Sequence, residues 1–266
     1  MKKFTVLAVL FALSLCVHLN IVAQTSQADL VITNANIRTM DAKRTIAKSI
    51  AMLNGKIIAI GSDADTRSLV GANTRVIDAG GKTIVPGFND AHVHFMETGS
   101  QLSSVDLRDA KTPAEFVARI KAFAAKLPKG RWIFGGKWDH ENWTPNALPT
   151  AALIDAATPD NPVFIDRLDG HMALANSLAM RLAGVNKETK EVDGGLIVRD
   201  ASGNPAGVFK DAAMSYIYRV IPDSSWDEKM EFAQAATEHA ASLGITSVTD
   251  VSGGTDVGVY QELIRQ

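Results

Sequence analysis

The chain has 266 residues, of which 46% are hydrophobic and 21% are charged, and its formal net charge is −2. These values are typical of a globular protein with one large domain or two smaller ones. A net charge this close to zero provides no positive field for nucleic acid, so no nucleic-acid partner is expected. The single cysteine, Cys16, lies in the leader described next, which leaves the mature chain without a disulfide framework or a thiolate metal site.

The first residues have the pattern of a secretory signal peptide. Lys2 and Lys3 precede an apolar run over residues 4–17, and small residues follow around Ala23. The run is shorter than the roughly 20 apolar residues that cross a bilayer, although a retained N-terminal anchor is the alternative. We therefore expect residues 1–23 to be removed and the protein to be exported, periplasmic or extracellular, with no membrane contact after cleavage.

Residues 29–84 favour short strands joined by tight turns. "DLVITNANIRTM" alternates and is β-branched, and "SIAMLNGKIIAIG" places two apolar runs around Asn54-Gly55, which favours a two-residue hairpin turn. "TRVIDAGGKTIVPGF" repeats the pattern around Gly80-Gly81. The absence of a helical period in this stretch predicts a small β-sandwich or β-roll.

Helical and strand patterns alternate after residue 95. "TPAEFVARIKAFAAKL" opens with Thr112, Pro113 and Glu115, a capping box with proline at the first helical position. "SSWDEKMEFAQAATEHAASLG" is a second capped helix that ends at Gly244. "RWIFGGKW" and "NPVFIDRL" indicate strands, "GGLIVRDASGNPAGVF" a hairpin and "ITSVTDV" a buried strand. This order predicts an α/β fold built from βα units with a largely parallel sheet.

Two histidines stand two residues apart at the end of an apolar run, in "VPGFNDAHVHF". Side chains at i and i+2 of a strand point to the same face, so His92 and His94 could bind one metal ion together. Asp90 shares that face if the strand is regular and could orient one of the histidines. Taken alone the spacing is equally compatible with two solvated histidines.

Several separate stretches, in order, carry a family resemblance. After the β-rich start come "GKTIVPGFNDAHVHF", "VDLRDAKTPAEF", "GGKWDHENW", "DRLDGHMALANSLAMRLAG", "GVFKDAAM" and "LGITSVTDVSG". Together they resemble the YtcJ-like (amidohydrolase 3) family of the amidohydrolase superfamily, whose member activities include removal of formyl groups from N-substituted formamides. The resemblance implies a metal-dependent (β/α)8 barrel and a small β-sandwich built from both chain ends. Residues 29–84 would then be the first part of the sandwich, and residues 85–266 the first part of a barrel that is incomplete here.

The resemblance also implies the metal chemistry. His92 and His94 would bind one or two divalent metal ions, for which Zn²⁺ is expected. In the superfamily a carboxylated lysine or an acidic residue can bridge two metals, and "GVFKDAAM" offers Lys210 or Asp211, of which we favour Asp211. The alternative is that Lys210 is a solvated surface charge and that Asp211 caps the following helix.

Catalytic roles are expected for Asp211 and for His171, which follows the apolar strand "PVFI" in a loop that could face substrate. A capping or buried, hydrogen-bonded histidine is the alternative for His171. Two other features have alternative interpretations. Asp250 could face the same site or cap a turn, and the loop "KWDHENW" could line a pocket or pack as a hydrophobic loop. His239, in the middle of a predicted helix, is interpreted as structural. The loop contributes four side chains of interest: Trp138, Asp139, His140 and Trp143.

The functional hypothesis is a metal-dependent hydrolase that acts on the non-peptide, amide-type carbon–nitrogen bond of a small molecule, with metal-activated water as the nucleophile. Deamination and ester hydrolysis are alternatives within that class. A different class is an exported, non-catalytic binding protein that keeps only part of the fold. The general base and the remaining metal ligands are expected to lie beyond Gln266.

Overall fold

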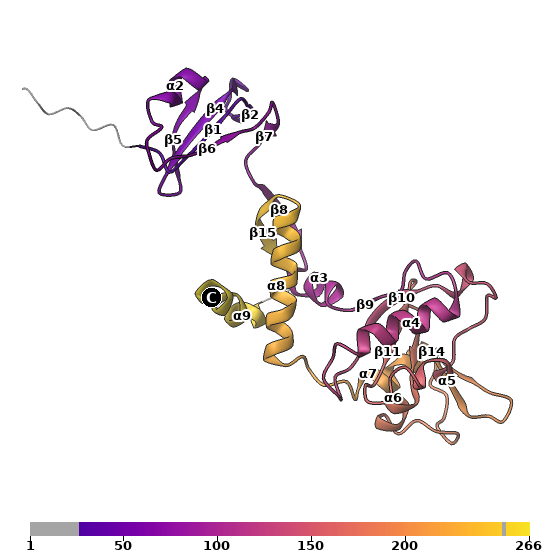
Figure 1. Ribbon diagram of the computed structural model, residues 1–266. Helices are drawn as coiled ribbons and strands as arrows, with labels where there is room; N and C mark the ends of the chain where they lie inside the picture. Colours follow the sequence, from indigo (N-terminus) through magenta and orange to yellow (C-terminus); the bar gives the residue numbers. More distant parts are fainter. Residues whose placement is uncertain (1–26, 252–253) are drawn as a thin grey trace, which may run out of the picture. The chain divides into compact units, whose positions relative to one another are not determined.

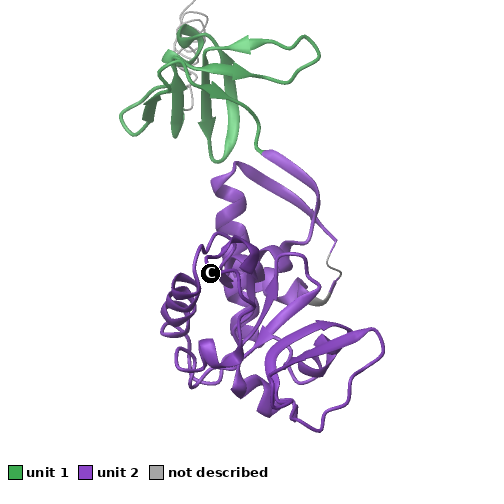
Figure 2. Ribbon diagram, turned by 90° about the vertical axis from the view of Figure 1, so that its right-hand side faces the viewer, with its two compact units in different colours: residues 1–87 green, residues 88–266 purple. Residues whose placement is uncertain are grey.

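The computed structural model describes residues 27–251 and 254–266, so the predicted signal peptide lies outside the described residues and stays a prediction. The chain divides into two compact units, one ending at Gly87 and the other beginning at Phe88 (Figure 2). Within the described ranges, none of the helices is both long enough and apolar enough to cross a membrane.

The first unit contains two small sheets, each with its own apolar cluster. A four-stranded sheet has the order β5-β4-β1-β6 and a three-stranded sheet the order β3-β2-β7 (Figure 1). The clusters are centred on Val31 with Ala51, and on Ile37 with Ile50. The elements are β1 (Leu30–Thr33), β2 (Asn36–Arg38), β3 (Ile46–Ala47), β4 (Ser49–Leu53), β5 (Lys56–Gly61), α2 (Asp63–Arg67), β6 (Arg75–Asp78) and β7 (Thr83–Ile84).

One of the two predicted turns in this unit joins a hairpin. Strands β4 and β5 pair antiparallel around Asn54 and Gly55, whose φ angles are 51° and 72°, as a two-residue hairpin turn requires. The prediction at Gly80-Gly81 is wrong. Strand β6 pairs parallel with β1 and β7 parallel with β2, so the chain passes from one sheet to the other at the glycines.

The first strand of the second unit pairs with the last one. Strand β8 (Phe88–Val93) pairs parallel with β15 (Ile245–Asp250), although most of the unit lies between them in the sequence. Helix α3 (Phe95–Leu102) follows β8, α8 (Trp226–Ser242) precedes β15, and α9 (Val257–Arg265) follows it. Helix α3 packs closely on α8 (Figure 1). The predicted cap of α8 is present, as a capping box between Ser225 and Glu228. Strand β15 is half exposed, which corrects the prediction that it is buried.

We call the part of the chain between α3 and α8, residues 103–225, the inserted segment. It forms a six-stranded sheet. Its order is β13-β14-β12-β11-β10-β9. Strands β9, β10 and β11 are mutually parallel, whereas β12, β14 and β13 add antiparallel neighbours. The strands are β9 (Val105–Asp106), β10 (Gly135–Trp138), β11 (Phe164–Arg167), β12 (Met172–Ala175), β13 (Gly195–Arg199) and β14 (Pro205–Asp211).

Each face of this sheet carries a separate hydrophobic core. Ile165, Leu174 and Val208 belong to one cluster, and Phe164 and Phe209 to the other, as alternation along paired strands requires. The helices are α4 (Pro113–Ala124), α5 (Ala151–Asp155), α6 (Ser177–Leu182) and α7 (Ser215–Tyr218), with short 3-10 turns at His140–Asn142, Ala212–Met214 and Gly254–Asp256. Helix α4 begins where predicted, with the Thr112 side chain accepting a hydrogen bond from the Glu115 N–H. The predicted capping box is only half formed, because the Glu115 carboxylate accepts from the Lys111 N–H instead of the Thr112 N–H.

The strands expected to continue a barrel therefore have other neighbours. The stretches "RWIFGGKW", "NPVFIDRL" and the predicted hairpin contribute β10, β11, β13 and β14 to the mixed sheet of the inserted segment. Strand β8 instead pairs parallel with β15. The chain is α/β, as predicted, but the sheet is mixed rather than largely parallel. The barrel, predicted to be incomplete here, and the β-sandwich stay predictions.

Candidate functional site

The two histidines lie at the carboxyl end of β8. His92 is in the strand and His94 directly precedes α3, and their ring centroids are 5.8 Å apart. Both residues are exposed. The Glu97 carboxylate lies 3.4 Å from His94 Nδ1, an arrangement that orients the ring and leaves Nε2 for a ligand. Asp90 accepts a hydrogen bond from the backbone N–H of His92, at 3.1 Å, so it fixes the backbone at this position.

Asp250 holds the start of α3 beside the histidines. It ends β15, the parallel partner of β8, and its Oδ1 accepts a hydrogen bond from the Phe95 backbone N–H at 3.1 Å. The Tyr260 hydroxyl donates to Oδ2 at 2.5 Å. Burial and the bond to Asp250 raise the pKa of Tyr260, so this hydroxyl keeps its proton. Asp250 thus binds the first N–H of α3, and it supports the segment that carries His94.

Two imidazoles on one strand end fit a divalent metal ion by their chemistry, because neutral imidazole nitrogen is a preferred ligand of zinc and related metals. In residues 27–251 and 254–266, however, no group of three or more histidine, cysteine, aspartate or glutamate side chains is placed to hold a metal. The pair can therefore supply two of the three or four protein ligands that such a site uses.

The other predicted site residues lie in the inserted segment. His171 Nδ1 and Asp211 Oδ1 are 2.9 Å apart, and the Asp211 backbone N–H donates to the His171 carbonyl at 3.0 Å. Lys210 is the neighbouring residue in β14 and pairs with Met172 of β12. Lys210 and Asp211 therefore belong to a different sheet from His92 and His94, and the structure does not gather the four into one cluster.

Asp166 and Tyr218 form a further pair of polar residues that the sequence did not indicate. Asp166 lies on the same sheet face as His171 and Asp211, because Asp166 is opposite Ala173, and Ala173 is two residues from His171. The Tyr218 hydroxyl donates to Asp166 Oδ1 at 3.2 Å. Burial raises the pKa of Asp166, and burial together with this carboxylate raises the pKa of Tyr218 to about 12. Neither residue stands in a recognisable local pattern, so only the strand register could reveal them.

The loop "KWDHENW" packs as a hydrophobic loop. Trp138 is fully buried, Trp143 is 3% exposed, and both belong to the core cluster that contains Phe116. Asp139 accepts a hydrogen bond from Arg167 at 2.9 Å. The packing alternative is therefore confirmed for the two tryptophans of this loop.

Comparison with known proteins places the chain in a family. The sequence pattern of the amidohydrolase family matches residues 75–266. The chain belongs to the amidohydrolase family. The resemblance predicted from the sequence is confirmed.

Two curated relatives and one solved structure show what this amidohydrolase chain is similar to. The Arabidopsis thaliana protein LONG AFTER FAR-RED 3 is 40% identical over 84% of this chain and 38% of its own length. The N-substituted formamide deformylase of Arthrobacter pascens is 32% identical over 85% of this chain and 43% of its own. The crystal structure of an uncharacterized metal-dependent hydrolase from Pyrococcus furiosus is similar with a TM-score of 0.68 and 27% identity, over 89% of this chain and 47% of that one. The chain thus spans less than half the length of each.

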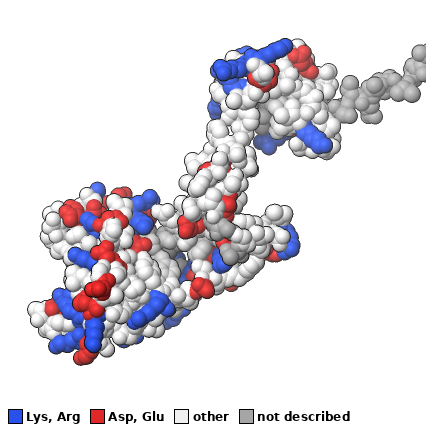
Figure 3. Space-filling view, turned by 180° about the vertical axis from the view of Figure 1, so that it is seen from behind, with Lys and Arg blue, Asp and Glu red and all other residues white. Residues whose placement is uncertain are grey.

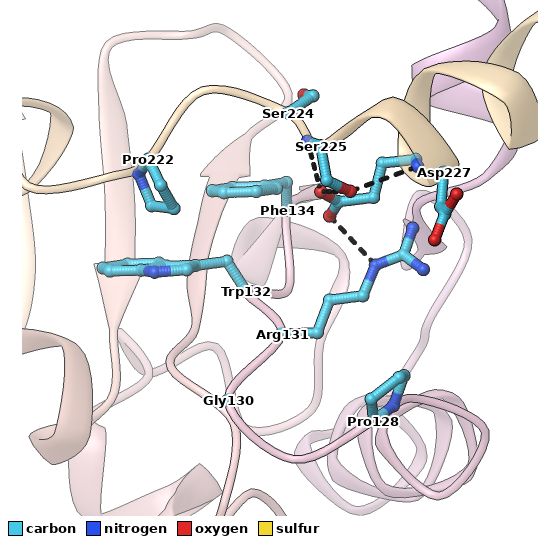
Figure 4. A pocket seen from close by; sticks show the side chains of 10 residues that line it. Pro128, Gly130, Arg131, Trp132, Phe134, Pro222, Ser224, Ser225 and Asp227 are labelled. Atoms are coloured by element: carbon cyan, nitrogen blue, oxygen red, sulfur yellow. Dashed lines mark hydrogen bonds and ion pairs between the residues drawn. The ribbon is translucent and has the colours of Figure 1, made fainter.

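The amidohydrolase chain also has a hollow where the inserted segment meets α8. It has a volume of about 330 Å³. In Figure 4 the rings of Trp132 and Phe134 lie parallel, and the Arg131 guanidinium reaches toward α8. Arg131 forms ion pairs with Glu228 at 3.1 Å and Glu231 at 2.7 Å. The Glu228 carboxylate also accepts hydrogen bonds from the Ser225 N–H and hydroxyl in the capping box. One carboxylate therefore stabilises both the start of α8 and its contact with Arg131.

Both signs of charge occur on the surface of the inserted segment. Basic and acidic side chains are interspersed on the face of it that Figure 3 shows. Arg119 illustrates the pattern, since it forms ion pairs with Asp109 and Glu115 at 2.5 Å each.

Proposed function

We propose that the protein is a metal-dependent hydrolase that acts on the amide-type carbon–nitrogen bond of a small molecule. The observation that carries the proposal is the pair His92 and His94 at the carboxyl end of a strand with a parallel neighbour, the edge where α/β enzymes build their sites. Family membership supports a hydrolase, and the Pyrococcus furiosus neighbour is described as metal-dependent. The choice of an amide-type substrate draws on the formamide deformylase relative.

His92 and His94 would hold the metal through ring nitrogens, with Zn²⁺ as the expected ion. When bound there, a divalent cation supplies Lewis-acid activation of water and of a carbonyl group. Glu97 orients the His94 ring, and Asp250 fixes the backbone that follows it. These two carboxylates are positioning residues, because each acts through the histidine segment rather than on the substrate.

Metal content tests the proposal directly. In the full-length gene product, we expect at least about one zinc ion per chain by elemental analysis. The double variant His92→Ala, His94→Ala should lose most of that metal, because removal of two ligands leaves too few donors for a stable site. Formate release from an N-substituted formamide should fall to the background rate in the same variant.

His239→Ala is the matched control, since His239 is an exposed histidine in α8. It should keep its metal content, because His239 is not one of the proposed ligands. Full metal content in the double variant would refute the ligand assignment, whereas bound metal without hydrolysis of any amide-type substrate would favour the non-catalytic alternative.

A further inference from the structure

A second hollow begins one helical turn from His94. It has a volume of about 340 Å³, and one face of α3 contributes Thr98, Gln101 and Leu102 to its wall. The Thr98 hydroxyl donates to the His94 carbonyl at 2.9 Å, so the wall is tied to the histidine segment. Residues of β9 and β10 also line the hollow, together with His239 of α8. A hollow of this size holds one end of a small molecule.

The acidic charge of the lining is already neutralised. Asp106 and Arg108, at the end of β9, both line the hollow, and the Arg108 guanidinium donates two hydrogen bonds to the Asp106 carboxylate at 2.9 and 2.7 Å. These bonds hold the pKa of Asp106 down at about 2, so the carboxylate stays ionised and paired. The pair leaves Lys137 as the lining cation that has no partner within the lining.

Lys137 sits in a backbone conformation that sets its side chain apart from the strand. The register between β10 and β11 shifts at this residue, and its φ angle is 53°. In the described part of the second unit, Lys137 and Asp211 are the two non-glycine residues with positive φ. A bulge of this kind re-aims one side chain away from regular alternation, and it is favoured next to functional sites.

The ammonium group of Lys137 keeps its hydrogen-bonding capacity. Its ion-pair partner Asp166 is 3.8 Å away, beyond hydrogen-bonding distance, and Asp166 instead accepts from Tyr218. Burial raises the pKa of Asp166, and the Lys137 charge opposes that rise. Lys137 makes no hydrogen bond through Nζ to any of the described residues, so its three donors can serve a ligand.

We propose that this hollow binds the carboxylate of an anionic amide-type substrate, with Lys137 as the residue that recognises the charge. The proposal rests on the hydrolase function above and adds the substrate class to it. An ammonium–carboxylate contact in a partly enclosed site gives affinity and also fixes which end of the substrate enters the hollow. The amide end would then lie on the side of α3 that carries His94.

Binding of a matched pair of compounds tests the inference without any need for turnover. N-formylleucine and N-isopentylformamide differ by the carboxylate alone. By calorimetry on the full-length protein, we expect N-formylleucine to bind about tenfold more tightly. Lys137→Gln should remove this preference and leave the affinity for N-isopentylformamide within about twofold, whereas Lys137→Arg should retain most of it.

Two controls isolate the lysine. Lys129→Gln removes a lysine that also forms an ion pair, with Asp160 at 2.9 Å, but lies outside the hollow, so the preference should persist. The His92→Ala, His94→Ala protein should keep it as well, which separates the hollow from carboxylate binding at a metal. Equal binding of the two compounds by the wild type, or loss of the preference in the histidine variant, overturns the inference. A carboxylate preference without formate release upholds the hollow and refutes only the reaction.

Discussion

At the scale of single residues, the Asp106–Arg108 pair makes a pH-dependent contribution to stability. The folded pKa of Asp106 is about 2, below its ordinary value of 3.8, because Arg108 donates hydrogen bonds to the carboxylate. A lowered folded pKa stabilises the fold above the unfolded pKa, and this contribution is lost as the pH falls toward 2. The Asp106 side chain is 55% exposed, so solvent screens the pair and the effect is small.

We therefore expect Asp106→Asn to lower the melting temperature at pH 7 by about 1–2 °C, and the difference from wild type to narrow as the pH is lowered from about 5 to 3. Thermal unfolding followed by circular dichroism measures it. Asp223→Asn is the control, since Asp223 is exposed and has no ion pair with the described residues. A difference that stays constant over this pH range would contradict the pairing.

The residues that sequence could identify are those whose partners are close in the chain. His92 and His94 are two residues apart, so one motif shows both. His171 and Asp211 were each noticed, but their 2.9 Å contact depends on the register that brings β12 and β14 together. Lys137 could not be identified from the sequence, because "GGKW" indicates a regular strand and gives no sign that the register shifts at the lysine.

At the scale of elements, helices were predicted better than strand partners for a physical reason. The helix starts at Thr112 and Ser225 are determined by side chains within three residues, and both caps are present. A strand has to find a partner elsewhere in the chain, and its own residues do not name it. Gly80-Gly81 shows the consequence, since a turn was expected to join a hairpin and joins two different sheets instead.

The contact between α3 and α8 depends on one glycine. A Cβ at Gly99 would lie 1.9 Å from the Phe232 carbonyl oxygen, which is backbone and cannot rotate away. Gly99→Ala should therefore lower the free energy of unfolding by roughly 1–3 kcal/mol, which outweighs a helix-propensity gain of about 1 kcal/mol. Since α3 begins next to His94, the variant should also bind less zinc. Urea denaturation and elemental analysis measure the two effects.

Gly258→Ala in α9 is the matched control. Its Cβ would meet the Trp226 ring at 3.5 Å, an ordinary contact, so helix propensity alone should act and raise stability by up to about 1 kcal/mol. If both substitutions stabilise the protein to the same extent, the close approach of α3 and α8 at Gly99 is refuted.

At the scale of the whole molecule, the family was predictable and the chain topology was not. Local motifs in sequence order were sufficient for the amidohydrolase resemblance, which the match over residues 75–266 confirms. The alternation of helices and strands also predicted successive barrel units, because every βα unit has the same local sequence pattern. Only the pairing of β8 with β15 shows that the strands between them build a sheet of their own.

This topology predicts that the inserted segment folds without its flanks. Both of its core clusters, around Trp138 and around Phe209, consist only of residues that lie within it. The ion pairs of Arg131 with Glu228 and Glu231 join it to α8, and such partly exposed pairs contribute little stability. A fragment of residues 103–225 should therefore unfold cooperatively on heating, with hydrogen-exchange protection in β11, β12 and β14.

A matched fragment of residues 226–266, which lacks the partner strand β8, should show no cooperative transition. If the 103–225 fragment melts without a transition, its sheet depends on the flanking helices, and the cores that it encloses are not sufficient to fold it.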